Sequence, residues 1–353
     1  MEPASDGTVE HRPGVLMAAE IAEQPAIFER LLTGAGGADR GAVAARIRAA
    51  GPRFVLVAAR GTSDHAALYL KYLVEIRLGL PCGLASPSTI TAYGARPDLR
   101  DVLWVAVSQS GGSPDLVEST AAAGRAGALT LAVTNAPDSP LARAAALQLD
   151  IGAGVERAVA ATKTYTATLL TLWLLVESLD DGDARAAEDL PRLAAEVVAE
   201  PAADEVAARF RFVDKVVVTG RGYAYPTARE AALKLMETSY LAAHAFSGAD
   251  LLHGPLAMVD EDRPVVAVTP HGTAGAAMQP VLARLADRGA DVTLVGDGSL
   301  GPASVVVPVP RVREDLSPLL EIIPLQRVAH AMAVARHHDP DAPRGLSKVT
   351  RTT

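Results

Sequence analysis

The sequence predicts an α/β fold in which two tandem, doubly wound parallel sheets carry helices on both faces. Short apolar, β-rich runs alternate with helical patterns, and this alternation is typical of parallel sheets. The same order of elements returns later in the chain. Arg221 follows Arg60 by 161 positions, and Gly272 follows Gly111 by the same distance. The length of 353 residues suits two such units.

The first copy starts with an apolar run at 54–58, which predicts a strand because it is short and followed by a turn. The turn at 60–63 passes into a helical pattern at 65–76. Two further strands and the helix between them are predicted at 102–107, 128–133 and 114–125.

The second copy repeats this order, with a strand at 215–219, a turn at 220–222 and a helix at 228–241. Its later strands include 266–268 and 293–294, which repeat 105–107 and 130–131. The acidic, Ala-rich stretch between the copies is predicted to be a helix. The expected organisation is an N-terminal helical segment 1–45, a first domain 46–180, a connecting helix 181–204, a second domain 205–335 and a tail 336–353.

The turn after the second strand of the first copy, 108–113 (SQSGGS), has the composition of an anion site. Backbone N–H groups at a helix N-terminus and Ser hydroxyls can hold a phosphate without a cation. Such a turn is more often an ordinary connection, but the carboxyl end of a parallel strand is where doubly wound sheets bind ligands. The second copy has 269–273 (TPHGT) here, and its proline removes a donor. Only the first copy is therefore expected to hold phosphate.

Composition excludes several classes of protein. With 33 Lys and Arg against 41 Asp and Glu, the charge of −8 argues against a nucleic-acid partner. The single cysteine, Cys82, forms no intramolecular disulfide, so a cytoplasmic location is expected. Residues 1–13 lack the apolar stretch of a signal peptide, and the apolar run 169–176 is too short to cross a membrane. No metal-ligand cluster or dinucleotide fingerprint occurs in the sequence, so no cofactor is expected.

Several motifs resemble tandem sugar isomerase (SIS) domains, namely 60–63 (RGTS), 108–111 (SQSG), 156–163 (ERAVAATK) and 220–222 (GRG). The segment 230–255 and the tail 343–349 (PRGLSKV) narrow the resemblance to the isomerase half of the glutamine:fructose-6-phosphate amidotransferases, or glucosamine-6-phosphate synthases. The resemblance runs from about Met17 to the end of the chain. It implies two flavodoxin-like SIS domains.

The synthases also carry an N-terminal glutaminase domain whose first residue is a nucleophilic cysteine. Here only some tens of residues precede the first copy, and Cys82 lies inside it. The resemblance therefore implies the sugar chemistry without a glutaminase. It is closest to the SIS-type glucosamine-6-phosphate deaminases, which the ending 339–350 favours. These convert glucosamine 6-phosphate to fructose 6-phosphate and ammonia.

The resemblance also implies three catalytic residues. His253 matches the family's ring-opening histidine, which is contributed across a subunit interface, so a homodimer is expected. Glu237 matches the carboxylate that moves a proton between C1 and C2. Lys348 matches the C-terminal lysine that forms a Schiff base in the synthases, and in a deaminase it is expected to assist ring opening or to stabilise the open-chain oxygen.

The substrate contacts follow from the same motifs. Ser108, Gln109, Ser110 and Ser113 are expected to bind the phosphate; Gly61, Thr62 and Ser63 are expected on the sugar side, with backbone groups of Val159 and the hydroxyl of Thr162. The sequence departs from the synthases at Arg60, Gly112, Met236 and Leu252, where they have cysteine, glutamate, lysine and lysine. These departures bear on the sugar's identity and on the direction of the reaction.

Each assignment has a simpler structural alternative. Lys234 and Glu237 could be an ordinary i,i+3 pair on a helix surface, His253 a turn residue and Lys348 a solvated charge. Two other functions stay open: deglycation of a fructosamine 6-phosphate or action on another amino sugar phosphate, and non-catalytic sensing of a sugar phosphate. A pure sensor would not need Glu237 and Lys348. In every case the expected partner is a small sugar phosphate.

Overall fold

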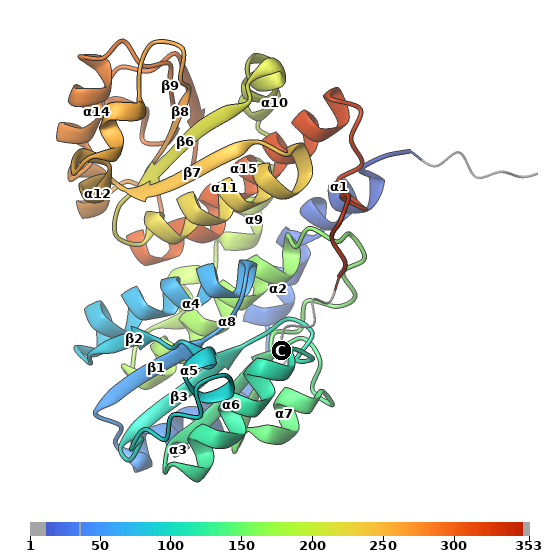
Figure 1. Cartoon of the computed structure of the whole chain (residues 1–353), viewed down its shortest axis with the longest axis vertical. Helices are drawn as coiled ribbons and strands as arrows, with labels where there is room; N and C mark the ends of the chain where they lie inside the picture. The colour runs from blue at the N-terminus through green and yellow to red at the C-terminus, as the bar shows by residue number, and fades with distance from the viewer. Residues whose placement is uncertain (1–11, 35–36, 349–353) are drawn as a thin grey trace, which may run out of the picture.

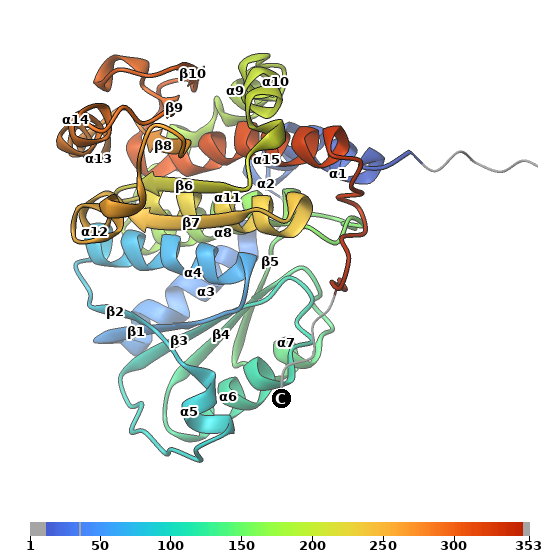
Figure 2. The ribbon, with the colours of Figure 1, turned by 45° about the horizontal axis from the view of Figure 1, so that its top comes forward.

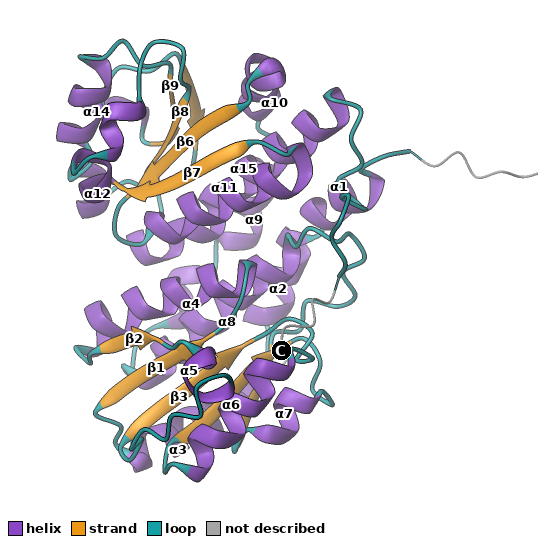
Figure 3. Cartoon of the chain, in the orientation of Figure 1, coloured by secondary structure: helices purple, strands orange, loops and turns teal. Residues whose placement is uncertain are grey.

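The protein consists of two five-stranded parallel sheets with helices packed on both faces of each, as the sequence predicts. The computed structural model describes residues 12–34 and 37–348. The first sheet has the order β2-β1-β3-β4-β5 and the second the order β10-β9-β8-β6-β7. If β6 is counted as the first strand of the second sheet and the order is read from the opposite edge, both sheets have the order 2-1-3-4-5. The two copies therefore share one topology (Figures 1 and 3).

The strands and helices have the following bounds. The strands are β1 Phe54–Ala58, β2 Cys82–Leu84, β3 Val102–Val107, β4 Leu129–Thr134, β5 Leu147–Asp150, β6 Lys215–Gly220, β7 Ala242–Ser247, β8 Val265–Thr269, β9 Val292–Gly296 and β10 Val305–Pro308. The α-helices are α1 Val15–Ala22, α2 Gln24–Leu32, α3 Gly37–Ala50, α4 Thr62–Leu73, α5 Pro87–Thr91, α6 Pro114–Arg125, α7 Pro140–Ala144, α8 Lys163–Leu179, α9 Leu190–Val198, α10 Ala202–Arg209, α11 Ala224–Ser239, α12 Gly248–Leu252, α13 Thr273–Ala276, α14 Gln279–Ala286 and α15 Ser317–Ala335.

The predicted elements differ from the structure at a few places. The connection 181–204, expected to be one helix, contains a short 3-10 turn, then α9 and the start of α10. Prolines explain the breaks, because Pro191 lies in the first turn of α9 and Pro201 caps α10. The boundaries expected after residues 45 and 204 fall inside α3 and α10.

The helical pattern at 65–76 belongs to α4, which starts at Thr62 and is extended by a π-helical turn, Val74–Leu78. The helix predicted at 228–241 is α11, which starts earlier and ends at Ser239 because Tyr240 has a positive φ. The edge strands β2, β5, β7 and β10 were not predicted, since β2, β5 and β10 have only three or four residues and β7 has few large apolar ones.

A layer of helices joins the two sheets. Helices α4 and α8 of the first copy pack against α11 and α15 of the second, between the sheets (Figure 2). Both α8 and α15 are buried along most of their length, and they share one hydrophobic core with the inner faces of the sheets. This layer brings the amino end of α4 beside α11. No helix among the described residues is long and apolar enough to span a bilayer.

The C-terminal segment returns from α15 to the first copy (Figure 1). Its Asp341 accepts hydrogen bonds from the N–H groups of Leu16 and Met17 at 2.9 and 2.7 Å. The carbonyl of Asp341 accepts a third bond, of 2.9 Å, from the N–H of Val159. These contacts fix the path of the tail and so bring Lys348 to the first sheet.

Candidate active site

The site begins where β1 and β3 end, which is the point at which the strand order of the first sheet reverses. After β1, Gly61 adopts φ +56°, which glycine tolerates, and α4 then starts at Thr62. After β3, the loop 108–113 leads into α6, whose first residue is Pro114. Two turns that are distant in the sequence are thus adjacent at one edge of the sheet.

The loop 108–113 is arranged to donate hydrogen bonds. The Ser108 hydroxyl oxygen accepts a bond of 3.2 Å from the N–H of Gly111, and the Ser110 oxygen accepts one of 3.3 Å from the N–H of Gly112. Because each hydroxyl oxygen serves as acceptor in the loop, its hydrogen is free to point towards an anion. Gly111 has φ +59°, and a Cβ there would lie 2.1 Å from Oγ of Ser139. The loop conformation therefore requires glycine.

A cavity of about 320 Å³ joins this loop to the other predicted residues. It is lined by Arg60, Gly61, Thr62, Ser63, Ser108, Gln109, Ser110, Ser113, Val159, Ala161, Glu237, Leu346, Ser347 and Lys348. All the predicted site residues are among them except Thr162 and His253. The turns of the first copy, a helix of the second and the tail thus meet around one space.

Glu237 reaches the cavity from α11 as part of a buried charged network. Lys234, which is fully buried, lies 2.5 Å from the Glu237 carboxylate and 3.3 Å from that of Glu230, and it donates to the Thr62 hydroxyl at 3.1 Å. Burial alone would lower the pKa of Lys234, but the two carboxylates outweigh it and raise the pKa. The ammonium therefore stays charged and holds Glu237, whose side chain is 22% exposed.

Lys348 enters from the tail and is held by the segment 156–162. Its Nζ lies 2.9 Å from the buried carboxylate of Glu156 and donates to the carbonyl of Ala158 at 2.6 Å. The same carboxylate accepts bonds from the N–H groups of Thr162 and Thr164 at 2.9 and 3.1 Å. Glu156 thus ties the start of α8 to the tail and orients the lysine at the cavity wall.

Two predicted residues lie elsewhere. Thr162 is completely buried and does not line the cavity, and its hydroxyl oxygen has no hydrogen-bond partner among the described residues. His253 is exposed at the end of α12 and does not line the cavity of its own chain. That it serves a second subunit stays a prediction.

Three side chains at the site have no role predicted from the sequence, namely those of Arg60, Glu230 and His65. Arg60 lines the cavity and is held at 2.8 Å by Asp115, which is buried in the first turn of α6. Glu230 lies on the same face of α11 as Lys234 and Glu237, a spacing that could have revealed it. His65 binds Glu230 from α4, and no sequence pattern predicts this contact.

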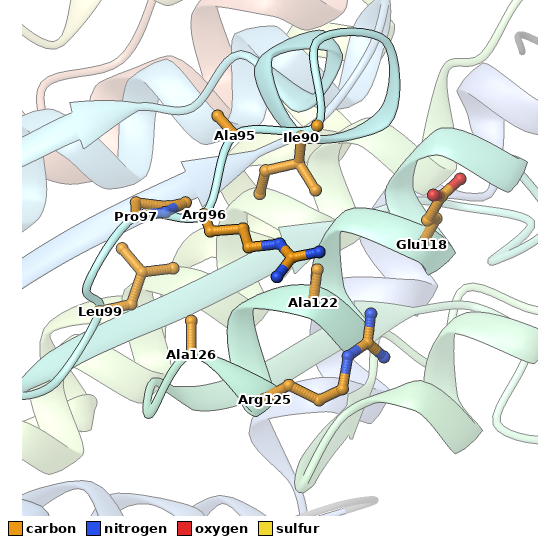
Figure 4. Close-up of a pocket in the computed structure, with 10 residues that line it drawn as sticks. Ile90, Ala95, Arg96, Pro97, Leu99, Glu118, Ala122, Arg125 and Ala126 are labelled. Carbon is orange, nitrogen blue, oxygen red and sulfur yellow. The ribbon is translucent and has the colours of Figure 1, made fainter.

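A second cavity, of about 510 Å³, lies on the outer face of the first sheet between α6 and the segment 94–99 (Figure 4). Arg96 and Arg125 extend along it over an apolar floor that includes Leu99. None of the predicted site residues lines it. The chemistry predicted from the sequence therefore belongs to the smaller cavity.

Comparison with known proteins identifies the family of the two domains. The model of the SIS domain matches residues 51–178 and 210–334. The glutamine–fructose-6-phosphate aminotransferase (isomerizing) of Pseudomonas putida is 36% identical over 98% of this chain, and one from Thermus thermophilus is 36% identical over 99%. The chain spans about 60% of the length of these relatives.

Solved structures show the same fold. A candidate phosphosugar isomerase from Silicibacter pomeroyi has a TM-score of 0.85 and 36% identity, over 93% of this chain and 100% of its own. The C-terminal domain of glucosamine-fructose-6-phosphate aminotransferase from Francisella tularensis has a TM-score of 0.80 and 26% identity, over 95% and 99%. A glucosamine-6-phosphate deaminase from Thermotoga maritima shares the fold, with a TM-score of 0.73 and 21% identity. The match covers 95% of this chain and 99% of the deaminase. The chain belongs to the SIS domain family and carries two copies of the domain in tandem.

Proposed function

We propose that this protein is a glucosamine-6-phosphate deaminase, which converts glucosamine 6-phosphate and water to fructose 6-phosphate and ammonia. The observation that carries the proposal is a single cavity lined by the loop 108–113, the Glu237 carboxylate and the Lys348 amine. A phosphate site, a base and a cation are the groups that aldose–ketose proton transfer on a phosphorylated sugar needs. The relatives that are named for fructose 6-phosphate support the substrate class.

In the proposed reaction, the loop 108–113 holds the phosphate and so fixes C1 and C2 near Glu237. Glu237 removes the proton from C2 of the open-chain sugar and returns it to C1. The amino nitrogen passes one proton to the C1 oxygen, so C1 becomes a hydroxymethyl group and C2 becomes an imine. Water then adds to the imine at C2, the nitrogen leaves as ammonia, and the ketone of fructose 6-phosphate remains. One carboxylate serves both carbons because they are adjacent.

Ring opening precedes this step and needs a group that both donates and accepts a proton near neutral pH. Histidine suits that task. We assign it to His253, which is exposed and lies outside the cavity of its own chain. The proposal therefore includes a homodimer in which each subunit supplies His253 to the other. In the proposed reaction Lys348 stabilises the oxygen that develops charge on opening, and its contact with Glu156 at 2.9 Å supports this role.

Arg60 favours a second candidate, the deglycation of a fructosamine 6-phosphate derived from an amino acid. Such a substrate carries a carboxylate in addition to its phosphate. Arg60 lines the cavity as a cation, and its ion pair with Asp115 leaves 43% of its side chain exposed. Guanidinium groups bind carboxylates in a planar, bidentate manner. Arg60 would therefore bind the carboxylate of this substrate, a group that an amino sugar phosphate does not have.

A substrate panel separates these functions. The protein is incubated with glucosamine 6-phosphate and, separately, with a fructosamine 6-phosphate made from an amino acid; ammonium, free amino acid and hexose phosphate are assayed. The deaminase proposal predicts ammonium and fructose 6-phosphate in equal amounts from the first substrate. Release of the amino acid alone would favour the deglycase. Binding of either sugar without any product would favour the sensor and contradict both enzymes.

A further inference from the structure

His65 ends a buried chain of charged side chains that begins at Glu237 in the cavity. Its Nδ1 lies 2.7 Å from Oε2 of Glu230, and only 8% of its side chain is exposed. The other oxygen of Glu230 accepts a bond of 3.0 Å from the Thr62 hydroxyl and lies 3.3 Å from Nζ of Lys234. Lys234 then reaches Glu237 at 2.5 Å. The chain crosses from α4 to α11 and so links the two domains.

We propose that His65 is a positioning residue for Glu237, acting through Glu230 and Lys234. The inference rests on the function proposed above, in which Glu237 is the base. Glu230 is fully buried, so each donor it loses leaves a carboxylate that water cannot reach. Without His65, Glu230 would draw the Lys234 ammonium towards itself. Glu237 would then lose the cation that orients it at the cavity.

The electrostatics of Glu230 agree with this arrangement. Burial opposes its negative charge, but Lys234 and His65 outweigh burial and lower the pKa of Glu230. One ammonium therefore lies between two carboxylates, of which only Glu237 is partly exposed. Without the hydrogen bond from His65, the Glu230 carboxylate would attract the Lys234 ammonium more strongly than Glu237 does. His65 therefore determines how close Lys234 stays to Glu237.

Few other ionisable groups face this chain. Tyr165, from α8, is buried; burial raises its pKa, and the charge of Glu230 raises it further, so the phenol stays neutral. Asp64, the neighbour of His65 on α4, lies 4.0 Å from Arg229 on α11, and these two charges offset each other. Within the described part of the chain, the side chains that contact the Glu230 carboxylate are thus His65, Thr62 and Lys234.

Steady-state kinetics on the full chain test the proposal. His65→Ala removes the donor, and His65→Asn returns an amide N–H close to the position of Nδ1. We expect His65→Ala to lower kcat about tenfold or more with KM changed less than about twofold, since the phosphate loop is intact. His65→Asn should recover most of the loss. His271→Asn, which alters a His–Asp pair outside the cavity, is the matched control.

The kinetic result overturns the proposal if His65→Ala keeps the wild-type kcat, or if its kcat and thermal stability fall while His65→Asn restores only the stability. A purely structural contact between α4 and α11 predicts that last pattern. Fructose 6-phosphate binding by each variant shows whether the cavity is still formed, so an inactive but folded His65→Ala is informative.

A second measurement does not depend on turnover and separates this inference from the proposed function. The side-chain ¹⁵N resonances of His65 are measured by NMR in the wild type and in Glu237→Gln. If the chain couples the two groups, removal of the Glu237 charge moves Lys234 towards Glu230 and shifts the His65 resonances. Unchanged His65 resonances overturn the coupling. A wild type that releases no ammonia overturns only the deaminase assignment.

Discussion

At the scale of single residues, Gly111 determines the shape of the loop 108–113, for which we propose phosphate binding. We predict that Gly111→Ala raises KM for the phosphorylated substrate about tenfold or more, because the residue has φ +59° and its new Cβ would collide with Ser139. The measurement is KM together with the affinity for fructose 6-phosphate. Gly154→Ala is the control, since Gly154 also has a positive φ but has open space around it. Equal effects from the two variants would show that the loop shape is unimportant for binding.

Glu321 illustrates how one buried residue makes stability depend on pH. It is fully buried in α15, and burial raises its pKa from 4.5 to about 8. The folded state therefore holds a proton that the unfolded state releases, and stability falls as the pH rises from about 4.5 through 8. We predict that Glu321→Gln raises Tm at pH 9 by several degrees and flattens the pH dependence. Glu118→Gln, at an exposed position, should do neither; a Glu321→Gln curve parallel to the wild type would contradict this account.

At the scale of elements, α11 carries the buried charges that join the copies. We predict that Lys234→Met destabilises the protein by about 3–5 kcal/mol in urea unfolding, because it leaves Glu230 and Glu237 without their shared cation. Lys71→Met removes a partly exposed i,i+4 pair with Glu75 and should cost less than about 1 kcal/mol. If Lys234→Met and Lys71→Met lowered the free energy of unfolding by the same amount, the buried network would not be what holds α11 to α4.

The central elements could be predicted from the sequence because their signals are local. The bounds of β3 and α6 match the predicted 102–107 and 114–125, where apolar runs meet Gly, Ser or Pro. The strand β7 was not predicted, because Ala242–Ser247 has few β-branched or large apolar residues. Its pairing with β6 holds it at the edge of the sheet. Edge strands depend on neighbours that the local sequence does not specify.

The same distinction applies to the site. The loop 108–113 is contiguous, so its composition alone pointed to an anion. The contact of His65 with Glu230 joins positions 165 residues apart, and only the packing of α4 on α11 produces it. Thr162 was expected at the cavity because its motif is close in sequence to Val159, but the structure buries it at the start of α8, outside the cavity lining.

At the scale of the whole molecule, the proposed exchange of His253 predicts complementation between subunits. Glu237→Gln and His253→Ala each inactivate every site of their own homodimer. In a mixed dimer one site carries both changes and the other carries neither. Mixing and refolding the two variants should therefore restore about a quarter of wild-type activity, since about half of the dimers are mixed. Activity that stays at the level of the single variants would contradict a shared site, and sedimentation measures the dimer itself.

The release of ammonia from glucosamine 6-phosphate, compared between the wild type and Glu237→Gln, tests whether Glu237 moves the C2 proton. Ammonium and fructose 6-phosphate are measured together, and substrate binding is measured on the same samples. We predict equal amounts of both products from the wild type. For Glu237→Gln we predict a loss of activity of about a hundredfold or more, with binding retained, because the amide cannot accept the C2 proton. A wild type that forms neither product, or a Glu237→Gln variant with unchanged turnover, would contradict the account.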